Sequence, residues 1–180
     1  MVSAQSTASN ASVRAAEAPR LSGLAPIVTE DARVLILGSF PSAASLAAGQ
    51  YYAHPRNHFW RLLGEVLGET LAEASYEERL RRIAAHRIAL FDTIVGCARN
   101  GSLDADIREP ELARVDLIAQ KAPMLQLIAF NGARAARASP SWSSRGYVTL
   151  ALPSSSAANT LAYASKLACW RALSGWIAER

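Results

Sequence analysis

The sequence predicts an α/β domain of three layers, α/β/α, in which helices cover both faces of a four-stranded, mainly parallel sheet. Four short apolar runs with the length of strands alternate with segments of helical periodicity, and this alternation is typical of parallel sheets. The 180 residues suffice for one domain with its own core. Hydrophobic residues make up 51% of the chain and charged residues 19%, which predicts a folded globular protein rather than a disordered one.

The beginning of the chain differs in composition from the rest. Residues 1–24 are rich in Ala and Ser and show neither helical nor strand periodicity, so we expect a disordered tail followed by a single domain over residues 25–180. The tail lacks the apolar core of a signal peptide. No apolar run in the chain approaches the roughly 20 residues that a membrane span needs, so we expect no membrane association.

The expected strands are short and apolar, as buried parallel strands are. They cover residues 33–38, 88–94, 125–130 and 147–152. The carboxyl ends of parallel strands meet at one edge of the sheet, where sites form in this class of fold. The loops at that edge are expected at 38–57, 96–103, 131–132 and 153–159, and the longer segment 96–107 is expected to have no regular structure.

The expected helices lie between these strands. Residues 59–67 have apolar side chains at helical spacing, and 76–86 combine such spacing with Glu and Arg at i,i+4. Pro110 at a first turn predicts a helix over 110–120. A short helix is expected to follow the third strand to about residue 138, and a closing helix to span 160–178.

Several classes of site are excluded by the residues that the chain lacks. Cys97 and Cys169 are too few for a disulfide framework or a four-thiolate cluster, and His54, His58 and His86 are too scattered for a dedicated zinc site. The sequence contains neither the GxGxxG nor the GxxxxGK[ST] phosphate-binding pattern. It also lacks GxSxG, which argues against a serine nucleophile.

The distribution of charge suits a polyanion. The net charge is +4, and no acidic residue occurs between Asp116 and Glu179. This acid-free segment contains Lys121, Arg134, Arg137, Arg145, Lys166 and Arg171. A surface free of acids is typical of proteins that bind DNA. The alternative is that an Arg-rich chain leaves such a gap without any partner.

Two loops at the expected site edge carry the most unusual residues. Residues 51–60 read Tyr-Tyr-Ala-His-Pro-Arg-Asn-His-Phe-Trp, and aromatic rings beside basic and amide groups suit a base that is stacked and read at its edge. The alternatives are that Phe59 and Trp60 belong to the core and that Asn57 caps a helix. Residues 152–159 read Leu-Pro-Ser-Ser-Ser-Ala-Ala-Asn, which fits a helix-capping turn or a loop that contacts DNA phosphates.

Taken together, these motifs resemble the uracil-DNA glycosylase superfamily, and within it the hypoxanthine-DNA (deoxyinosine) glycosylases called family 6. The resemblance covers residues 30–178. It is carried by the motifs at 38–42, 51–60, 97–104, 130–132 and 152–156, of which the second is specific and the others support it by order and spacing.

The resemblance implies the fold of that superfamily and a monofunctional enzyme that hydrolyses the N-glycosidic bond of a deaminated base, most simply hypoxanthine, in base excision repair. It places the catalytic amide at Asn57, because Phe40 stands where mismatch-specific relatives carry a water-positioning asparagine. Tyr52 matches a residue that stacks on the flipped base. The expected base-binding residues are Ser39, Phe40, Tyr52, His54 and Asn131, and those of the DNA-binding loop are Pro153, Ser154, Ser155, Ser156 and Asn159.

The resemblance also implies the partners. We expect DNA containing a deaminated base as substrate, no metal or other cofactor, a monomer, and a bacterial-type cytoplasmic protein that lies on the nucleoid when bound to DNA. Iron–sulfur branches of the superfamily need four cysteines and are excluded. Asp92, at the end of the second strand, either approaches the reacting groups or, as we expect, caps or braces a loop. Two alternatives remain: a glycosylase for uracil, thymine or xanthine, and a nucleic-acid-binding module without catalysis.

Overall fold

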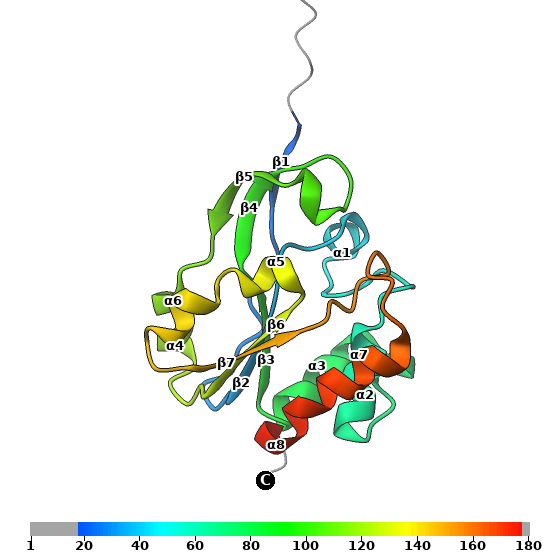
Figure 1. Cartoon of the computed structure of the whole chain (residues 1–180), viewed down its shortest axis with the longest axis vertical. Coiled ribbons are helices and arrows are strands. Elements are labelled where there is room, and N and C mark those ends of the chain that lie inside the picture. Colours follow the sequence, from blue (N-terminus) through cyan, green and yellow to red (C-terminus); the bar gives the residue numbers. More distant parts are fainter. Residues whose placement is uncertain (1–17, 178–180) are drawn as a thin grey trace, which may run out of the picture.

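A four-stranded parallel sheet forms the centre of the computed structural model, which describes residues 18–177 (Figure 1). Its strands are β2 (Val34–Gly38), β3 (Ile88–Asp92), β6 (Leu127–Asn131) and β7 (Val148–Leu152), in the spatial order β3-β2-β6-β7. All three pairings are parallel. The predicted sheet is therefore confirmed, with strand boundaries shifted by one or two residues.

Helices cover both faces of this sheet, as the three-layer prediction requires (Figure 1). One face packs against α2 (Phe59–Leu67), α3 (Tyr76–Ala85) and α7 (Tyr163–Trp170), and the other against α4 (Val115–Lys121), α5 (Ala133–Ala136) and α6 (Ser139–Ser143). Side chains alternate along a strand. In β2, Val34 and Ile36 therefore join the first core, while Leu35 and Leu37 join the second.

A second, antiparallel sheet was not predicted. It consists of β1 (Arg20–Ser22), β4 (Ile94–Ala98) and β5 (Arg108–Leu112), in the order β1-β4-β5. Three predictions are therefore wrong: residues 20–22 belong to a strand rather than to a tail ending at 24, the segment 96–107 is not entirely loop, and 110–120 is not one helix. Residues 1–17 of the expected tail lie outside the described residues.

The physical reason for the third error lies in the position of β5. Every residue of this edge strand is exposed, and a proline is tolerated at an edge because its missing N–H need not pair. Pro110 therefore sits in a strand, and the helix begins only at Val115. The closing helix likewise consists of α7, a 3₁₀ turn (Arg171–Leu173) and α8 (Ser174–Ile177).

Three short elements lie in the connections between these strands and helices. They are α1 (Ala43–Ala48) and the 3₁₀ turns Leu71–Glu73 and Asp104–Asp106. Ser42 caps α1 by accepting a hydrogen bond from the backbone N–H of Ser45 at 3.1 Å. Helix α2 ends at Gly68 in the left-handed conformation, and the chain turns back so closely that the N–H of Glu69 donates to the carbonyl of Gly64 at 2.8 Å.

This close return predicts that Gly64→Ala destabilises the protein, although alanine is normally the better helix former. A Cβ at position 64 would lie 2.5 Å from the carbonyl oxygen of Glu69 and 3.2 Å from the backbone nitrogen of Leu71. Overpacking against backbone costs about 1–3 kcal/mol of unfolding free energy, which urea denaturation measures. Gly175→Ala in α8 is the control, because nothing lies within 4 Å of its Cβ. It is expected to be neutral or stabilising by up to about 1 kcal/mol, and equal stability of the two variants would contradict the contact.

Candidate functional site

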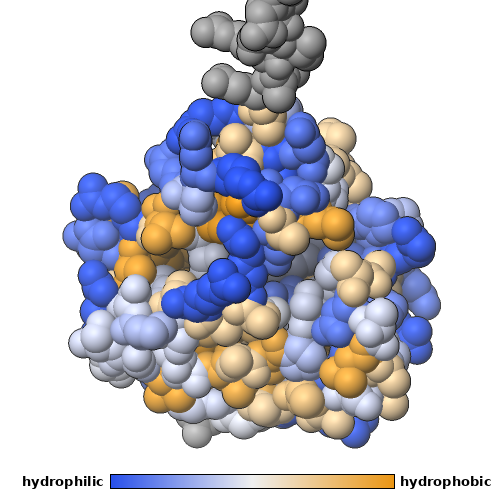
Figure 2. All heavy atoms as spheres, turned by 45° about the horizontal axis from the view of Figure 1, so that its top comes forward, coloured by the Kyte–Doolittle hydropathy of each residue, from blue (hydrophilic) through white to orange (hydrophobic). Residues whose placement is uncertain are grey.

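The carboxyl ends of the parallel strands open into a cavity of about 290 Å³. All four loops predicted to meet at this edge contribute to it. Its wall includes residues 38–42, 102–104 and 154–156 together with Ser45, Tyr51, Tyr52, Asn57, Asp92, Asn131, Ala158 and Asn159. Figure 2 shows a hollow near the middle of the face turned toward the reader, with both hydrophilic and hydrophobic side chains around it. The edge of the sheet at which we expect a site thus contains a cavity lined by the predicted loops.

Asp92 lies in the wall of this cavity at the end of β3 and is 3% exposed. Its carboxyl makes no hydrogen bond with any described residue, so it does not brace a loop as expected. Burial raises the pKa of Asp92 to about 8; the charge of Asp104 adds to this effect and Arg99 opposes it. The carboxyl is therefore largely protonated at neutral pH. A Cβ on Gly38, the residue paired with Asp92, would collide with Oδ1, so the cavity requires glycine there.

Tyr52 lines the cavity with a stacked ring and an unpartnered hydroxyl group. Its ring stacks on Phe59 with centroids 3.6 Å apart and planes 10° apart, so one face is covered. The hydroxyl is buried near Asn131 and makes no hydrogen bond of normal geometry. Burial raises the pKa of Tyr52, which keeps the hydroxyl protonated as a donor. The backbone of Tyr52 is left-handed, with φ of 55°, as an unusual turn into a site often is.

His58 is the N-cap residue of α2 but makes no side-chain capping bond, and Asn57, one position earlier, bonds to the first helical residue instead, which is close to the capping role of the alternative interpretation. Oδ1 of Asn57 accepts a hydrogen bond from the backbone N–H of Phe59 at 3.0 Å. The backbone N–H of Asn57 donates to the carbonyl of His54 at 2.8 Å, which fixes the turn before the helix. With Oδ1 engaged, the side-chain NH₂ is the part of Asn57 left for the cavity that it lines.

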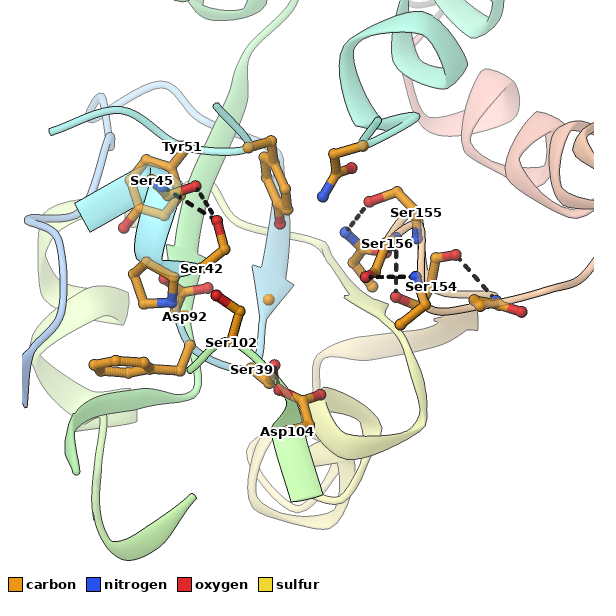
Figure 3. A pocket seen from close by; sticks show the side chains of 18 of the residues that line it. Ser39, Ser42, Ser45, Tyr51, Asp92, Ser102, Asp104, Ser154, Ser155 and Ser156 are labelled. Atoms are coloured by element: carbon orange, nitrogen blue, oxygen red, sulfur yellow. Dashed lines mark hydrogen bonds between the residues drawn. The ribbon is translucent and has the colours of Figure 1, made fainter. Parts of the chain in front are cut away.

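The loop 153–159 is clamped to the end of β6. The side chain of Asn131 donates to Oγ of Ser155 and accepts from its backbone N–H, both at 2.8 Å. The backbone N–H of His58 donates to the carbonyl of Ser155 at 3.0 Å, and Asn159 donates to the carbonyl of Ser154 at 3.0 Å. Both ends of the Asn131 amide are thus engaged. Figure 3 shows Ser154, Ser155 and Ser156 on the opposite side of the cavity from Asp92 and Ser39.

The predicted site residues divide into two groups. Those in the cavity wall are Ser39, Phe40, Tyr52, Asn57, Asn131, Ser154, Ser155, Ser156 and Asn159. His54 and Pro153 are not in the wall. His54 shapes its turn by accepting the backbone N–H of Arg56 on Nδ1 at 3.2 Å, and the carbonyl of Pro153 accepts the indole N–H of Trp170 at 3.0 Å.

Arg99 is a residue of the site that the sequence analysis did not identify. It is 1% exposed, donates to the carbonyl of Pro41 at 2.6 Å, and lies 4.8 Å from the centre of the Phe40 ring. Its Nε and Nη1 have no partner among the described residues. The guanidinium thus supports the cavity loop 39–42 from behind. A single arginine within the motif at 97–104 was the only signal, and sequence spacing does not reveal burial.

The acid-free segment does not form one surface. Lys121 ends α4, in the connection that leads to β6, and Arg145 precedes β7, so both lie at the amino edge of the sheet, away from the cavity. Arg134 and Arg137 follow the carboxyl end of β6 on the side of the cavity. Lys166 is fully buried. The cavity edge therefore carries fewer free basic side chains than the gap in acidic residues suggested.

Two properties of the described residues bear on other ligands. Among residues 18–177 there is no cluster of three or more His, Cys, Asp or Glu side chains placed to hold a metal ion. Within the same range, the helices are too short and too polar to cross a membrane.

Comparison with known proteins gives a consistent result. Residues 25–174 match the family model of the uracil DNA glycosylase superfamily. The chain is 37% identical over 148 residues to a hypoxanthine DNA glycosylase of Methanosarcina barkeri, which covers 82% of this chain and 94% of that protein. It is 38% identical over 151 residues to the hypoxanthine DNA glycosylase of Methanosarcina acetivorans, covering 84% and 96%. A solution NMR structure of a candidate uracil DNA glycosylase from M. acetivorans superimposes with a TM-score of 0.82 at 35% identity, covering 89% of this chain and all of that one.

The buried carboxyl predicts an unusual dependence of stability on pH. The folded protein keeps the Asp92 proton up to about pH 8, whereas the unfolded chain releases it near the ordinary pKa of 3.8. The unfolding free energy contributed by Asp92 therefore falls as pH rises between about 4 and 8 and is constant above. Asp92→Asn removes this titration, so the stability of the variant relative to the unsubstituted protein should increase from pH 5 to pH 8 in urea denaturation.

Asp116→Asn is the control for this experiment. The hydrogen bond from Arg114 lowers the pKa of Asp116, so its contribution has the opposite sign and disappears only at acid pH. Between pH 5 and pH 8 the difference between this variant and the unsubstituted protein should stay flat. If the Asp92→Asn difference is also flat, the carboxyl is not buried as described.

Proposed function

Because the chain belongs to the uracil-DNA glycosylase superfamily, we propose that it is a monofunctional DNA glycosylase that excises hypoxanthine and leaves an abasic site. Two relatives, which the chain matches over 94% and 96% of their length, are named for that activity. The observation that carries the proposal is the cavity, in which the carboxyl of Asp92 and the hydroxyl of Tyr52 are buried without partners. Such groups are costly unless a ligand pairs with them. The protein acts as a monomer, in the cytoplasm, on DNA that contains a deaminated base.

The two unpartnered groups suit the edge of hypoxanthine. A protonated carboxyl and a hydroxyl are both donors. Hypoxanthine presents two acceptors side by side, O6 and N7, as guanine does, whereas adenine presents the donor N6 amino group beside N7. Asp92 and Tyr52 together therefore favour the deaminated purine over adenine. Extrusion of the base from the duplex brings this edge into the cavity.

Phe40 is the ring that we assign to the face of the base. It lines the cavity, and the guanidinium of Arg99 lies over it. The ring of Tyr52 is stacked on Phe59 and its buried hydroxyl has no partner, so we assign the hydroxyl of Tyr52 to the base. Stacking of a base on an aromatic ring stabilises binding by about 1–3 kcal/mol, and it helps to offset the cost of extrusion.

The reaction breaks the bond between C1′ of the sugar and N9 of the base. The bonding electron pair leaves with the base, which takes up a proton, while the oxygen of a water molecule bonds to C1′ and loses one. Asn57 holds this water through its side-chain NH₂, and Asp92 donates a hydrogen bond to the departing base, where negative charge develops. Of the two lysines of the chain, Lys121 lies at the far edge of the sheet and Lys166 is bonded to loop carbonyls, so neither lysine amine is placed to form a covalent intermediate.

Asn57→Ala should lower single-turnover excision of hypoxanthine by roughly 100-fold or more, because one group that holds the reacting water is lost. The substitution also removes a helix cap, which costs about 1 kcal/mol of stability. Ser75→Ala is the matched control, since Oγ of Ser75 caps α3 by accepting the N–H of Glu78 at 3.2 Å, outside the cavity wall. Asn57→Asp restores the cap but not the amide donor, and it should stay slow. Near-normal excision by Asn57→Ala would return this residue to its capping role.

Hypoxanthine excision should fall as pH rises through about 8, because Asp92 then loses the proton with which it donates. Asp92→Asn keeps an N–H donor at every pH, so its lower rate should be independent of pH in this range.

Tyr52→Phe should also lose excision while keeping its ring on Phe59. The measurement is single-turnover base release between pH 6 and pH 9.5 from duplexes carrying hypoxanthine, xanthine, uracil or thymine. A rate that rises above pH 8, or a Tyr52→Phe variant of full activity, would contradict the assignment of the donors. Duplex binding without release of any base would favour the alternative function, a nucleic-acid-binding module without catalysis.

A further inference from the structure

Lys166 is a buried basic residue near the cavity that has no role in the proposed reaction. It lies in the first turn of α7 and is fully buried. Side chains on a helix point back toward its amino end. Accordingly, Nζ of Lys166 reaches under the preceding loop and donates to the carbonyl oxygens of Asn159 at 2.8 Å and Ser156 at 3.3 Å.

The charge of Lys166 has no opposite charge beside it. No carboxylate of the described residues forms an ion pair with its ammonium, and burial alone lowers its pKa. The titratable neighbours are His58, whose own pKa is lowered by burial and by Lys166, and Arg61. Glu65 on the same side is occupied by Arg61 at 3.7 Å and by the hydroxyl of Tyr163 at 2.6 Å. The environment of the ammonium is thus neutral or positive.

The helices around Lys166 add to this positive potential. Both α2 and α7 begin beside the loop 153–159, and a helix start carries a partial positive charge. The two loop carbonyls satisfy the hydrogen-bonding capacity of the ammonium only in part, and no carboxylate balances its charge. The uncompensated positive charge at this place suits an anion that approaches from outside when the protein binds its ligand.

The loop that Lys166 holds also positions the proposed catalytic segment. Its residues Ser154–Ser156 line the cavity, and the carbonyl of Ser155 accepts the N–H of His58, the neighbour of Asn57. The loop surface above Lys166 carries no acid, and Ala157, Ala158 and Thr160 are exposed on it. An anion at this surface is close to both the loop and the flipped base.

We propose that Lys166 is a positioning residue that holds the loop 153–159 in its DNA-binding conformation and whose charge is neutralised by a backbone phosphate of the bound duplex. The inference rests on the proposed function only in taking DNA as the ligand. The salt dependence of DNA binding distinguishes this role of Lys166 from a purely structural one. A charge that is neutralised by phosphate contributes about −0.9 to the slope of log affinity against log salt concentration. A lysine that only holds the loop in place contributes nothing to that slope.

The test compares Lys166→Met with Lys166→Arg and with Lys121→Met, which removes the only other lysine, at the far edge of the sheet. Affinity for an undamaged duplex and for a hypoxanthine duplex is measured over a range of salt concentrations. Lys166→Met should weaken binding of both duplexes and make the slope shallower by about 0.9. Lys166→Arg and Lys121→Met should keep the original slope. If Lys166→Met does not fold, Lys166→Gln, which keeps an N–H donor without the charge, takes its place.

The outcomes separate this inference from the proposed function. An unchanged slope in Lys166→Met, or in Lys166→Gln where that variant replaces it, overturns the phosphate role even if the unsubstituted protein releases hypoxanthine. A shallower slope in a protein that binds duplex but releases no base supports the role of Lys166 and contradicts the glycosylase. Failure of the unsubstituted protein to bind duplex DNA contradicts both.

Discussion

The absence of a side chain at Gly38 is the constraint on which the site depends. Parallel pairing of β2 with β3 sets Gly38 directly beside Asp92, so any Cβ there would occupy the place of the carboxyl. Because this place is open, a carboxyl group enters the end of an apolar sheet, where burial keeps it protonated near neutral pH. The same register brings the ends of β6 and β7 to that edge, with Asn131 beside Leu152. The chemistry of the cavity follows from the register of the sheet.

Each of two walls of the cavity is anchored by a buried cation, in addition to the apolar packing of Phe40 and the hydrogen bonds of Asn131. Arg99 holds the loop 39–42 through the carbonyl of Pro41, and Lys166 holds the loop 153–159 through two carbonyls. The electrostatic consequence is that a largely neutral Asp92 has the positive charge of Arg99 nearby, while the opposite wall carries the charge of Lys166. Such an environment favours negative charge on a departing base and on nearby phosphates. Loop anchoring and electrostatics are thus carried by the same side chains.

The sequence predicts the parallel sheet because buried parallel strands are continuous apolar runs, a strong local signal. The antiparallel sheet carries no such signal, since β1 has three residues and β5 is exposed throughout. Most of the cavity wall could be predicted, because it comes from loops after strands and from an aromatic motif. The acid-free segment does not form the single basic surface that the sequence suggested, and the reason is topological. Successive connections in an α/β fold lie at opposite edges of the sheet, so Lys121 and Arg134 are close in sequence but lie at different ends of β6. The burial of Asp92, Arg99 and Lys166 depends on tertiary contacts and has no local signature.

Unpaired buried polar atoms identify the same region without reference to any relative. Among the described residues, such side-chain atoms belong to Tyr52, His58, Asp92 and Arg99. Tyr52 and Asp92 line the cavity, His58 follows the wall residue Asn57, and Arg99 supports the wall residues Phe40 and Pro41. Folded proteins pair nearly all such atoms, so their concentration at one edge is not a property of folding alone. It is the expected state of a site whose partners arrive with the ligand, and the free protein is correspondingly less stable than its core would allow.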